Sequence, residues 1–393
     1  MKKYSTLVSS SVLALFLATF TLSAQAFDYV QMERGQQELE QQMLQVSDWF
    51  QDQGYFRSNL MLAVTGLGFS KQLHADKVIE VLNASINSKQ LQKSDWHLLA
   101  RFCQKAHLKT ESIKAENTGN NSTNKFVNWC KKNRIASEYT KNDADNSYAY
   151  LFQIDLSADD PYNRDNQRLL EKAAASKYVT DYYGYGLHTY IIHLGEYFRS
   201  HQVEPVNMGY GFGTADNAEG MFTHPYLIFA ASVSLSYPLG AAGHCGKSQQ
   251  QLWSSFDDKT VLECIRLMKL FRSDKNTLTD NLLANVIIAS LSPPGSEEQL
   301  EATRLKNTNQ LVYECLTTWG DPANGELASV MQHAVFLKMT QLLESMGEIQ
   351  AMAVVFDQYY AKRQHKDAPK PSSCLLLKDL SFEAAEKLLA AKK

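Results

Sequence analysis

The sequence lacks the signature motifs of the common hydrolases. Neither G-x-S-x-G nor H-E-x-x-H occurs in its 393 residues, and these motifs carry the nucleophile or the metal ligands of their families. Ser122 and Lys125 form an S-x-x-K match, but two fixed positions in four residues recur by chance in a chain of this length. The sequence therefore assigns no catalytic residue, no metal ligand and no cofactor-binding residue.

Long apolar runs and clustered basic residues are also scarce. Beyond the first 26 residues, no apolar segment approaches the ~20 residues that a membrane-spanning helix needs. The formal net charge is -3 at pH 7, and basic residues gather only in short pairs such as Lys131-Lys132. Because nucleic-acid binding needs a clustered basic face, we expect neither a nucleic-acid partner nor a transmembrane segment in the mature chain.

The first 26 residues have the layout of a secretory signal peptide. Lys2 and Lys3 give a basic start, an apolar run extends over 12–22, and Ser-Ala-Gln-Ala ends at Ala26. This pattern predicts cleavage after Ala26 and export to the periplasm or the medium. Residue 27 is Phe rather than Cys, which argues against a lipid anchor. Loss of the two lysines would change the formal net charge from -3 to -5.

Six cysteines follow the predicted signal peptide. An even number of cysteines in an exported protein favours disulfides, although six cysteines allow 15 pairings. Short loops close most easily, so we expect the pairs Cys103–Cys130, Cys245–Cys264 and Cys315–Cys374. A zinc site is the weaker alternative, because C-x-x-C is absent and only Cys245 has an adjacent histidine, His244.

Only nine prolines occur, and apolar residues recur at helical spacing through most of the chain. In "SDWHLLARFCQKAH", Ser94 or Asp95 is expected to serve as the N-cap. Ser296 with Gln299 has the spacing of a capping box. The pattern predicts an all-α protein of antiparallel helix pairs, either an irregular α-solenoid or a helical bundle.

Polar, turn-rich stretches divide the chain. The stretch 109–124 is expected to be a loop, and 202–218 a second one. The glycines in "GYGFGTADNAEG" lack the preceding strand that a phosphate loop requires, so we interpret them as a turn. The predicted organisation is a signal peptide (1–26), an N-terminal helical region (27–201), the loop 202–218, a C-terminal helical region (219–365), and a linker with a terminal helix (366–393).

Two segments give the chain a resemblance to helical-repeat proteins. "SDWHLLARFCQKA" and "ADNSYAYLFQIDLSA" are both expected to be capped helices with an aromatic residue near the start, about fifty residues apart. In these helix pairs the chain resembles the tetratricopeptide and related α-solenoid families, whose helix pairs need neighbours to cover their apolar faces. Their 34-residue pattern does not recur in register, so the resemblance implies an architecture and no functional residue.

Pairs of carboxylates offer a further candidate for chemistry. Asp143 with Asp145 could hold calcium, but the following "DADNSYAYLFQI" lacks the closing Glu of a calcium loop. Asp143 and Asp145 are expected at a helix start, as are the pairs Asp159-Asp160 and Asp257-Asp258. Carboxylates are favoured there by unpaired amides and the helix dipole, so we interpret all of them as caps.

The stretch "DYYGYGLHTYIIHLGEYFRSH", residues 181–201, has the highest density of aromatic and metal-ligating side chains. At about 100° per residue, His188 and His193 lie about 140° apart and cannot share a metal from one helix, whereas His193 and Glu196 are neighbours. Ile192 and Tyr185 lie opposite the main stripe, so this helix is expected to pack on two sides. The main apolar stripe consists of Tyr183, Leu187, Tyr190, Ile191, Leu194 and Phe198.

These patterns favour an exported binding or scaffold protein over an enzyme. The expected partner is a protein, a peptide or an envelope component held on a concave surface. The alternative is an exported metal-dependent hydrolase with His193 and Glu196 in its site. It would need a third ligand from elsewhere, for example His224 or His244. The sequence does not indicate an oligomeric state.

Overall fold

The computed structural model describes residues 29–65, 75–115, 121–154, 163–182, 184–203, 245, 258–272, 276–319, 333–348, 350, 351 and 354. Within these ranges the regular secondary structure is helical, and the only bridge of strand type is an isolated pairing of Asn146 with Tyr178. The predicted all-α fold is confirmed.

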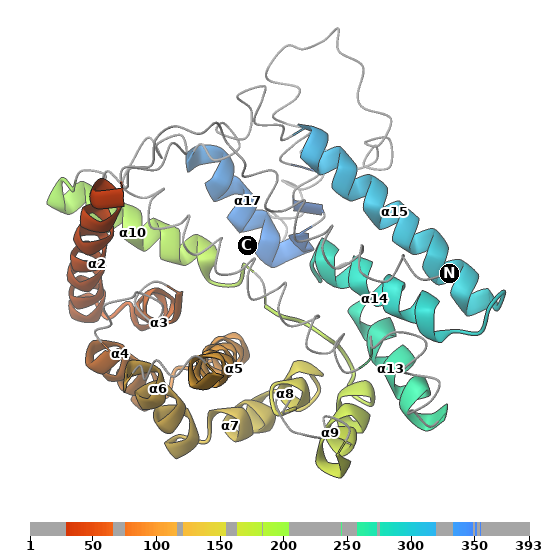
Figure 1. Ribbon diagram of the computed structural model, residues 1–393. Coiled ribbons are helices and arrows are strands. Elements are labelled where there is room, and N and C mark those ends of the chain that lie inside the picture. The colour runs from red at the N-terminus through yellow and green to blue at the C-terminus, as the bar shows by residue number, and fades with distance from the viewer. Residues whose placement is uncertain are drawn as a thin grey trace, which may run out of the picture.

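Thirteen helices are described, and they are arranged in a ring, in chain order except for one helix (Figure 1). Consecutive helices pack side by side, most extensively α5 with α6, α13 with α14 and α14 with α15. The N-terminal helices are α2 (Tyr29–Asp52), α3 (Phe56–Thr65), α4 (Ala75–Asn87), α5 (Lys93–Ala115), α6 (Asn121–Lys132), α7 (Ile135–Asn142), α8 (Tyr148–Leu151), α9 (Arg164–Ala174) and α10 (Leu187–His201). The C-terminal helices are α13 (Asp258–Phe271), α14 (Leu278–Leu291), α15 (Glu297–Trp319) and α17 (His333–Met346).

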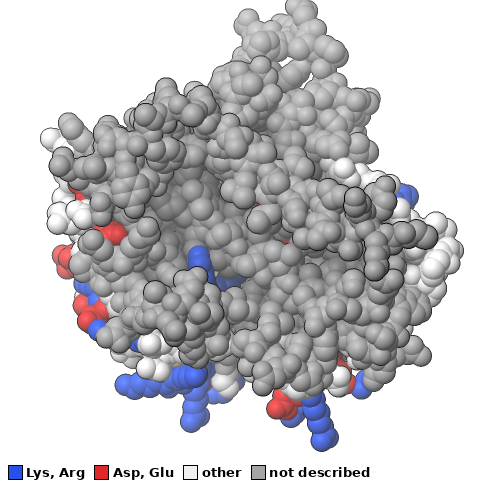
Figure 2. Space-filling model, viewed as in Figure 1, with Lys and Arg blue, Asp and Glu red and all other residues white. Residues whose placement is uncertain are grey.

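Helix α10 closes the ring. It contacts α2 and α3 at the start of the chain and α17 near its end, while α9 contacts α13 on the opposite side of the ring (Figure 1). In the face drawn in Figure 2, side chains of both charge signs lie along the outer edge, and basic side chains are visible in a hollow near the middle. Interspersed charge of this kind fits the small formal net charge of the chain.

Polar side chains fix several helix starts. Thr277 and Asp280 form a reciprocal capping box at the start of α14. Ser296 Oγ accepts from the amide of Gln299 at 3.3 Å, as the spacing predicted. Gln299 Oε1 accepts from the amide of Gly295 at 2.7 Å, one residue earlier than in a standard capping box.

Two predicted boundaries are wrong. Helix α5 begins at Lys93, so Asp95 is in its first turn, where its carboxylate accepts from the amide of Gln92 at 2.8 Å. The stretch 109–124 is not a loop throughout, because α5 continues to Ala115 and α6 begins at Asn121. The stretch 109–115 contains two lysines, a glutamate and an alanine, which favour helix, and the expectation of a loop gave this preference too little weight.

Two of the three expected cysteine pairs are present as disulfides. Cys103–Cys130 joins α5 to α6, and Cys245–Cys264 joins residue 245 to α13. Cys315 lies within α15, but its side chain and Cys374 are outside the described residues. The third pairing therefore stays a prediction, as do the division into two helical regions and the linker with a terminal helix expected over 366–393, which lies outside the described residues.

Most of the buried side chains form one continuous apolar core. Its largest fully buried members are contributed by α2, α3, α4, α5, α7, α8, α10 and α13, so the core follows the inside of the helix pairs around the ring. They include Phe50, Leu60, Phe102, Tyr139, Tyr148, Tyr190 and Phe271. Of the described helices, none combines the length and apolarity that crossing a membrane requires.

Candidate functional site

The three histidines of α10 contact three different neighbours. His188 Nδ1 lies 3.3 Å from Thr340 Oγ1 on α17, whereas His193 Nδ1 lies 2.8 Å from Ser58 Oγ on α3. His201 stacks on Tyr197 of its own helix, with ring centroids 4.2 Å apart. The angular projection separated His188 from His193, and the structure places the two side chains against helices from opposite ends of the chain.

Residues around α3 complete the flank that carries His193 and Glu196. The Tyr55 ring stacks on the His193 ring with centroids 3.6 Å apart, and the Tyr55 hydroxyl donates to Glu196 Oε2 at 3.0 Å. Burial lowers the pKa of His193, and the charge of Glu196 opposes this only in part. Among the described residues, the flank therefore gains the hydroxyls of Tyr55 and Ser58 and no third metal ligand.

A metal centre has no support in the described part of the chain. No cluster of three or more His, Cys, Asp or Glu side chains that could hold a metal is found there. The two distant ligands considered for the hydrolase alternative, His224 and His244, lie outside the described residues. The pair of His193 and Glu196 instead contributes to the contact between α10 and α3.

The expected second packing face of α10 is formed by other residues than predicted. Ile192 and Tyr185 are 41% and 37% exposed, so neither is buried against a neighbour. His188 of α10 contacts α17, and Gly184, in the turn before α10, adds to this contact, because an added Cβ there would lie 2.7 Å from Leu343 Cβ. A projection of the apolar residues of α10 misses this contact, because a histidine and a glycine of the preceding turn contribute to it.

Asp143 is a buried hydrogen-bond acceptor, which corrects its interpretation as a cap at a helix start. It is the residue that ends α7, and its carboxylate accepts from the hydroxyls of Tyr178 at 2.5 Å and Tyr182 at 2.8 Å. Asn146 Nδ2 donates to it at 3.0 Å, and Lys93 Nζ lies 3.1 Å away. Burial and these hydrogen bonds raise the pKa of both tyrosines. Asp143 thereby holds the segment between α9 and α10.

A second buried polar group lies beside this network. His97 is fully buried against the rings of Tyr139, Tyr148, Phe152 and Tyr182, and its Nδ1 lies 2.8 Å from the Tyr139 hydroxyl. Burial, aided by the charge of the nearby Arg101, lowers the pKa of His97 well below its usual value.

Arg101 links α5 to the same segment between α9 and α10. Its Nη2 lies 3.6 Å from Asp181 Oδ2, with both side chains almost fully buried. Burial and the charge of Asp181 raise the pKa of Asp280, at the start of α14, well above its usual value. This group was not predicted from the sequence. Its signal was the i, i+4 placement of His97 and Arg101 within the apolar pattern of "SDWHLLARFCQKAH".

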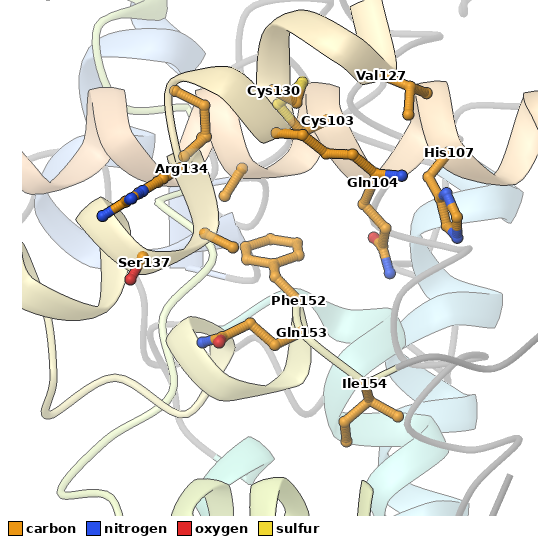
Figure 3. Close-up of a pocket in the computed structure, with 14 residues that line it drawn as sticks. Cys103, Gln104, His107, Val127, Cys130, Arg134, Ser137, Phe152, Gln153 and Ile154 are labelled. Carbon is orange, nitrogen blue, oxygen red and sulfur yellow. A yellow bond between two sulfur atoms is a disulfide. The ribbon is translucent and has the colours of Figure 1, made fainter. Parts of the chain in front are cut away.

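A pocket of about 410 Å³ lies between α5, α6, α7 and the residues that follow α8 (Figure 3). Its volume falls within the ~300–1,000 Å³ usual for small-ligand sites. The Cys103–Cys130 disulfide is part of its lining and joins two of the helices that enclose it. The apolar lining consists of Ala100, Val127, Ile135, Ala136, Phe152 and Ile154. We call this site the α5–α7 pocket.

Polar groups of the α5–α7 pocket come from each of its surrounding elements. Figure 3 shows Arg134 and Ser137 on one side, His107 on the other, and Phe152 with Gln153 between them. Gln153 is oriented by bonds from its Nε2 to Thr140 Oγ1 at 2.8 Å and to the carbonyl of Ala149 at 2.7 Å. Sequence analysis noted the Lys131-Lys132 pair and the cysteines, but nothing in one helix shows that three helices enclose a cavity.

Fold and site together define an all-α protein of packed helix pairs, arranged in a ring and carrying a ligand-sized pocket in the described part of its wall. Comparison with protein-family models, with curated proteins and with solved structures finds no match for this chain.

Proposed function

We propose that this chain is an exported binding protein, and that a protein, peptide or envelope component places a group in the α5–α7 pocket. The pocket itself is the observation that carries the proposal, because it is the described feature with the size and mixed lining of a ligand site. Its lining offers apolar walls for contact area and a few polar groups for orientation.

The covalent structure around the pocket supports binding rather than incidental packing. The Cys103–Cys130 disulfide holds α5 and α6 together before any ligand arrives. A wall fixed in advance lowers the entropy lost on binding, which is the usual route to affinity in a small site.

Export is supported by two features. Disulfides form and persist in oxidising compartments outside the cytoplasm, and two are present. The signal-peptide pattern of residues 1–26 would direct the chain there. The architecture of packed helix pairs, similar to that of α-solenoid proteins, is one that commonly serves binding.

The test fills the pocket and examines what co-purifies with the chain. Ala136 lines the pocket and is half-buried at the second position of α7, so Ala136→Phe should occupy the cavity with little disturbance of the core. Native mass spectrometry of the chain isolated from the cells that make it is expected to show a bound mass on the wild type and loss of that mass on Ala136→Phe.

Ala175→Phe is the matched control. Ala175 is exposed at the end of α9 and does not line the pocket, so this variant should carry the same mass as the wild type. The proposal fails if the wild type carries no bound mass, or if Ala136→Phe retains all of it.

A further inference from the structure

We infer that the α5–α7 pocket takes an amphipathic anion, a molecule with an apolar body and one anionic head group. This inference rests on the proposed binding function and adds the chemistry of the ligand. It follows from the charges around the pocket, from the helix end that forms part of its lining and from its apolar walls.

The lining is positively charged and contains no acid. Lys131 at the end of α6 and Arg134 just before α7 both line the pocket, His107 lies across from Arg134 (Figure 3), and none of the fourteen lining residues is Asp or Glu. A ligand with a positive charge would meet like charges here, whereas an anion would meet opposite ones.

Lys131 and Arg134 also differ from several nearby cations that are paired within the chain. Lys141 pairs with Glu138 at 2.5 Å, Lys125 with Asp76 at 2.9 Å and Lys177 with Asp145 at 3.0 Å. Neither Lys131 nor Arg134 forms an ion pair with any residue that the structure describes. Two exposed cations at the same cavity, without an ion-pair partner among the described residues, can pair with a ligand.

The start of α7 reinforces this charge. Its first three residues, 135–137, line the pocket, and the N-cap residue Arg134 provides no side-chain hydrogen bond to the first turn. Unpaired amides and the helix dipole make such an end favourable for an anion. The helix end adds to the two side-chain charges and would not define a site without the cavity.

The apolar walls of the pocket indicate the second feature of the ligand, its apolar body. Val127, Ile135 and Phe152 give the pocket apolar sides, and Ala100 and Ala136 keep it open because they are small. A fully hydrated ion such as free phosphate would leave these surfaces uncovered. An apolar body displaces water from them, at about 25 cal/mol for each Å² buried.

A purely structural role for Lys131 is the competing explanation. A lysine in the last turn of α6 is favourable because it faces the negative end of the helix dipole. Lys132 occupies the same turn and does not line the pocket. Lys131 and Lys132 are therefore a matched pair in which the helix-end effect is shared and the position at the pocket is not.

Arg134 can be replaced without strain. Its backbone is left-handed, with φ 51° and ψ 40°, a conformation in which Asn is much more acceptable than most residues. Arg134→Asn removes the charge at a position whose backbone Asn tolerates well, so a loss of binding would not reflect local unfolding.

The experiment titrates the mature, disulfide-bonded chain with three probes of equal chain length, decanoate, decanol and decylammonium, by isothermal titration calorimetry. We expect decanoate to bind about tenfold or more tightly than decanol, since a hydrogen-bonded charge pair is typically worth this much, and decylammonium to bind least. Lys131→Gln and Arg134→Asn should each weaken decanoate several-fold and leave decanol unchanged, while Lys132→Gln should match the wild type. Decyl phosphate in a fourth arm distinguishes a phosphate head group from a carboxylate.

The outcomes separate this inference from the binding function. If decanol binds as tightly as decanoate and Ala136→Phe abolishes both, the pocket binds ligands and the anionic head group is wrong. If Lys132→Gln weakens decanoate as much as Lys131→Gln, general surface charge accounts for the preference and the inference is overturned. If no probe binds while the co-purified mass still depends on Ala136, the ligand class is wrong and the binding function stands.

Discussion

At the scale of single residues, burial rather than residue type decides what the histidines do. His97 is fully buried in a shell of aromatic rings, and its single described hydrogen bond runs through Nδ1 to the Tyr139 hydroxyl. Burial lowers the pKa of His97, and the positive charge of the nearby Arg101 lowers it further. His97 is therefore neutral in the folded protein.

The neutral state of His97 makes stability depend on pH in a definite direction. Its folded pKa lies below the unfolded value of about 6.5, so the unfolded chain binds more protons as the pH falls below 6.5. Stability is then lost by about 1.4 kcal/mol per pH unit until the folded pKa is reached. His97→Phe should remove this contribution, so its free energy of unfolding, from urea titrations at pH 7 to 4.5, should fall less steeply than that of the wild type.

Tyr139→Phe is the control for the lost hydrogen bond. It removes this bond and also the one that the Tyr139 hydroxyl accepts from Asn146 Nδ2, at a cost of about 1 kcal/mol each, but it leaves the buried imidazole in place. Its pH dependence should therefore follow the wild type. Parallel curves for the wild type and His97→Phe would show that His97 is not kept neutral by the fold.

The residues of these networks show where sequence reasoning ends. Helical spacing predicted the apolar face of α10 and the separation of His188 from His193, because both depend on one helix. Asp143 was misread as a cap, because its donors Tyr178 and Tyr182 lie 35 and 39 residues further along the chain. Contacts across such distances follow from the path of the chain, which periodicity does not encode.

At the scale of elements, the turn that precedes α10 contributes as much to the closure of the ring as the helix itself. Gly184 and Gly186 both have positive φ, at 79° and 77°, and Gly184 lies against Leu343 of α17. The sequence "YYGYG" supplies glycine where the backbone turns left-handed and where α17 leaves no room for a side chain. This turn sets the direction from which α10 closes the ring.

Gly184→Ala should destabilise the protein by about 2 to 4 kcal/mol. A left-handed Ala costs about 1 kcal/mol or more, and an added Cβ at 2.7 Å from Leu343 Cβ forces the packing to shift. Gly54→Ala is the control, because its φ is 73° and nothing lies within 4 Å of an added Cβ, so it should cost only about 1 kcal/mol. Urea unfolding of both variants measures the difference, and equal losses would mean that α17 does not pack closely against this turn.

At the scale of the whole molecule, the fold class followed from the sequence, but the ring did not. Few prolines and helical spacing were enough to predict packed helix pairs, and the capping pair Ser296–Gln299 correctly placed the start of α15. The closure of the ring by α10 was beyond prediction, since α2 and α17 meet the same helix from opposite ends of the chain. The α5–α7 pocket escaped prediction for the same reason.

The two disulfides should have separable effects, because only one adjoins the α5–α7 pocket. Cys103–Cys130 closes a sequence separation of 27 residues and Cys245–Cys264 one of 19. Replacing both cysteines of either pair by alanine should lower the free energy of unfolding by about 3 kcal/mol, since loops of similar length lose similar closure entropy.

Ligand binding is expected to distinguish the two disulfides. Without Cys103–Cys130, α5 and α6 are joined only by packing, so the pocket wall must be ordered again on binding, and the affinity for decanoate should fall about fivefold. Without Cys245–Cys264, which does not line the pocket, the affinity should stay that of the wild type. Calorimetric titration below the unfolding transition of each variant makes the comparison. Equal losses of affinity would mean that the two disulfides act only through global stability, and that the bond between α5 and α6 does not preorganise the pocket.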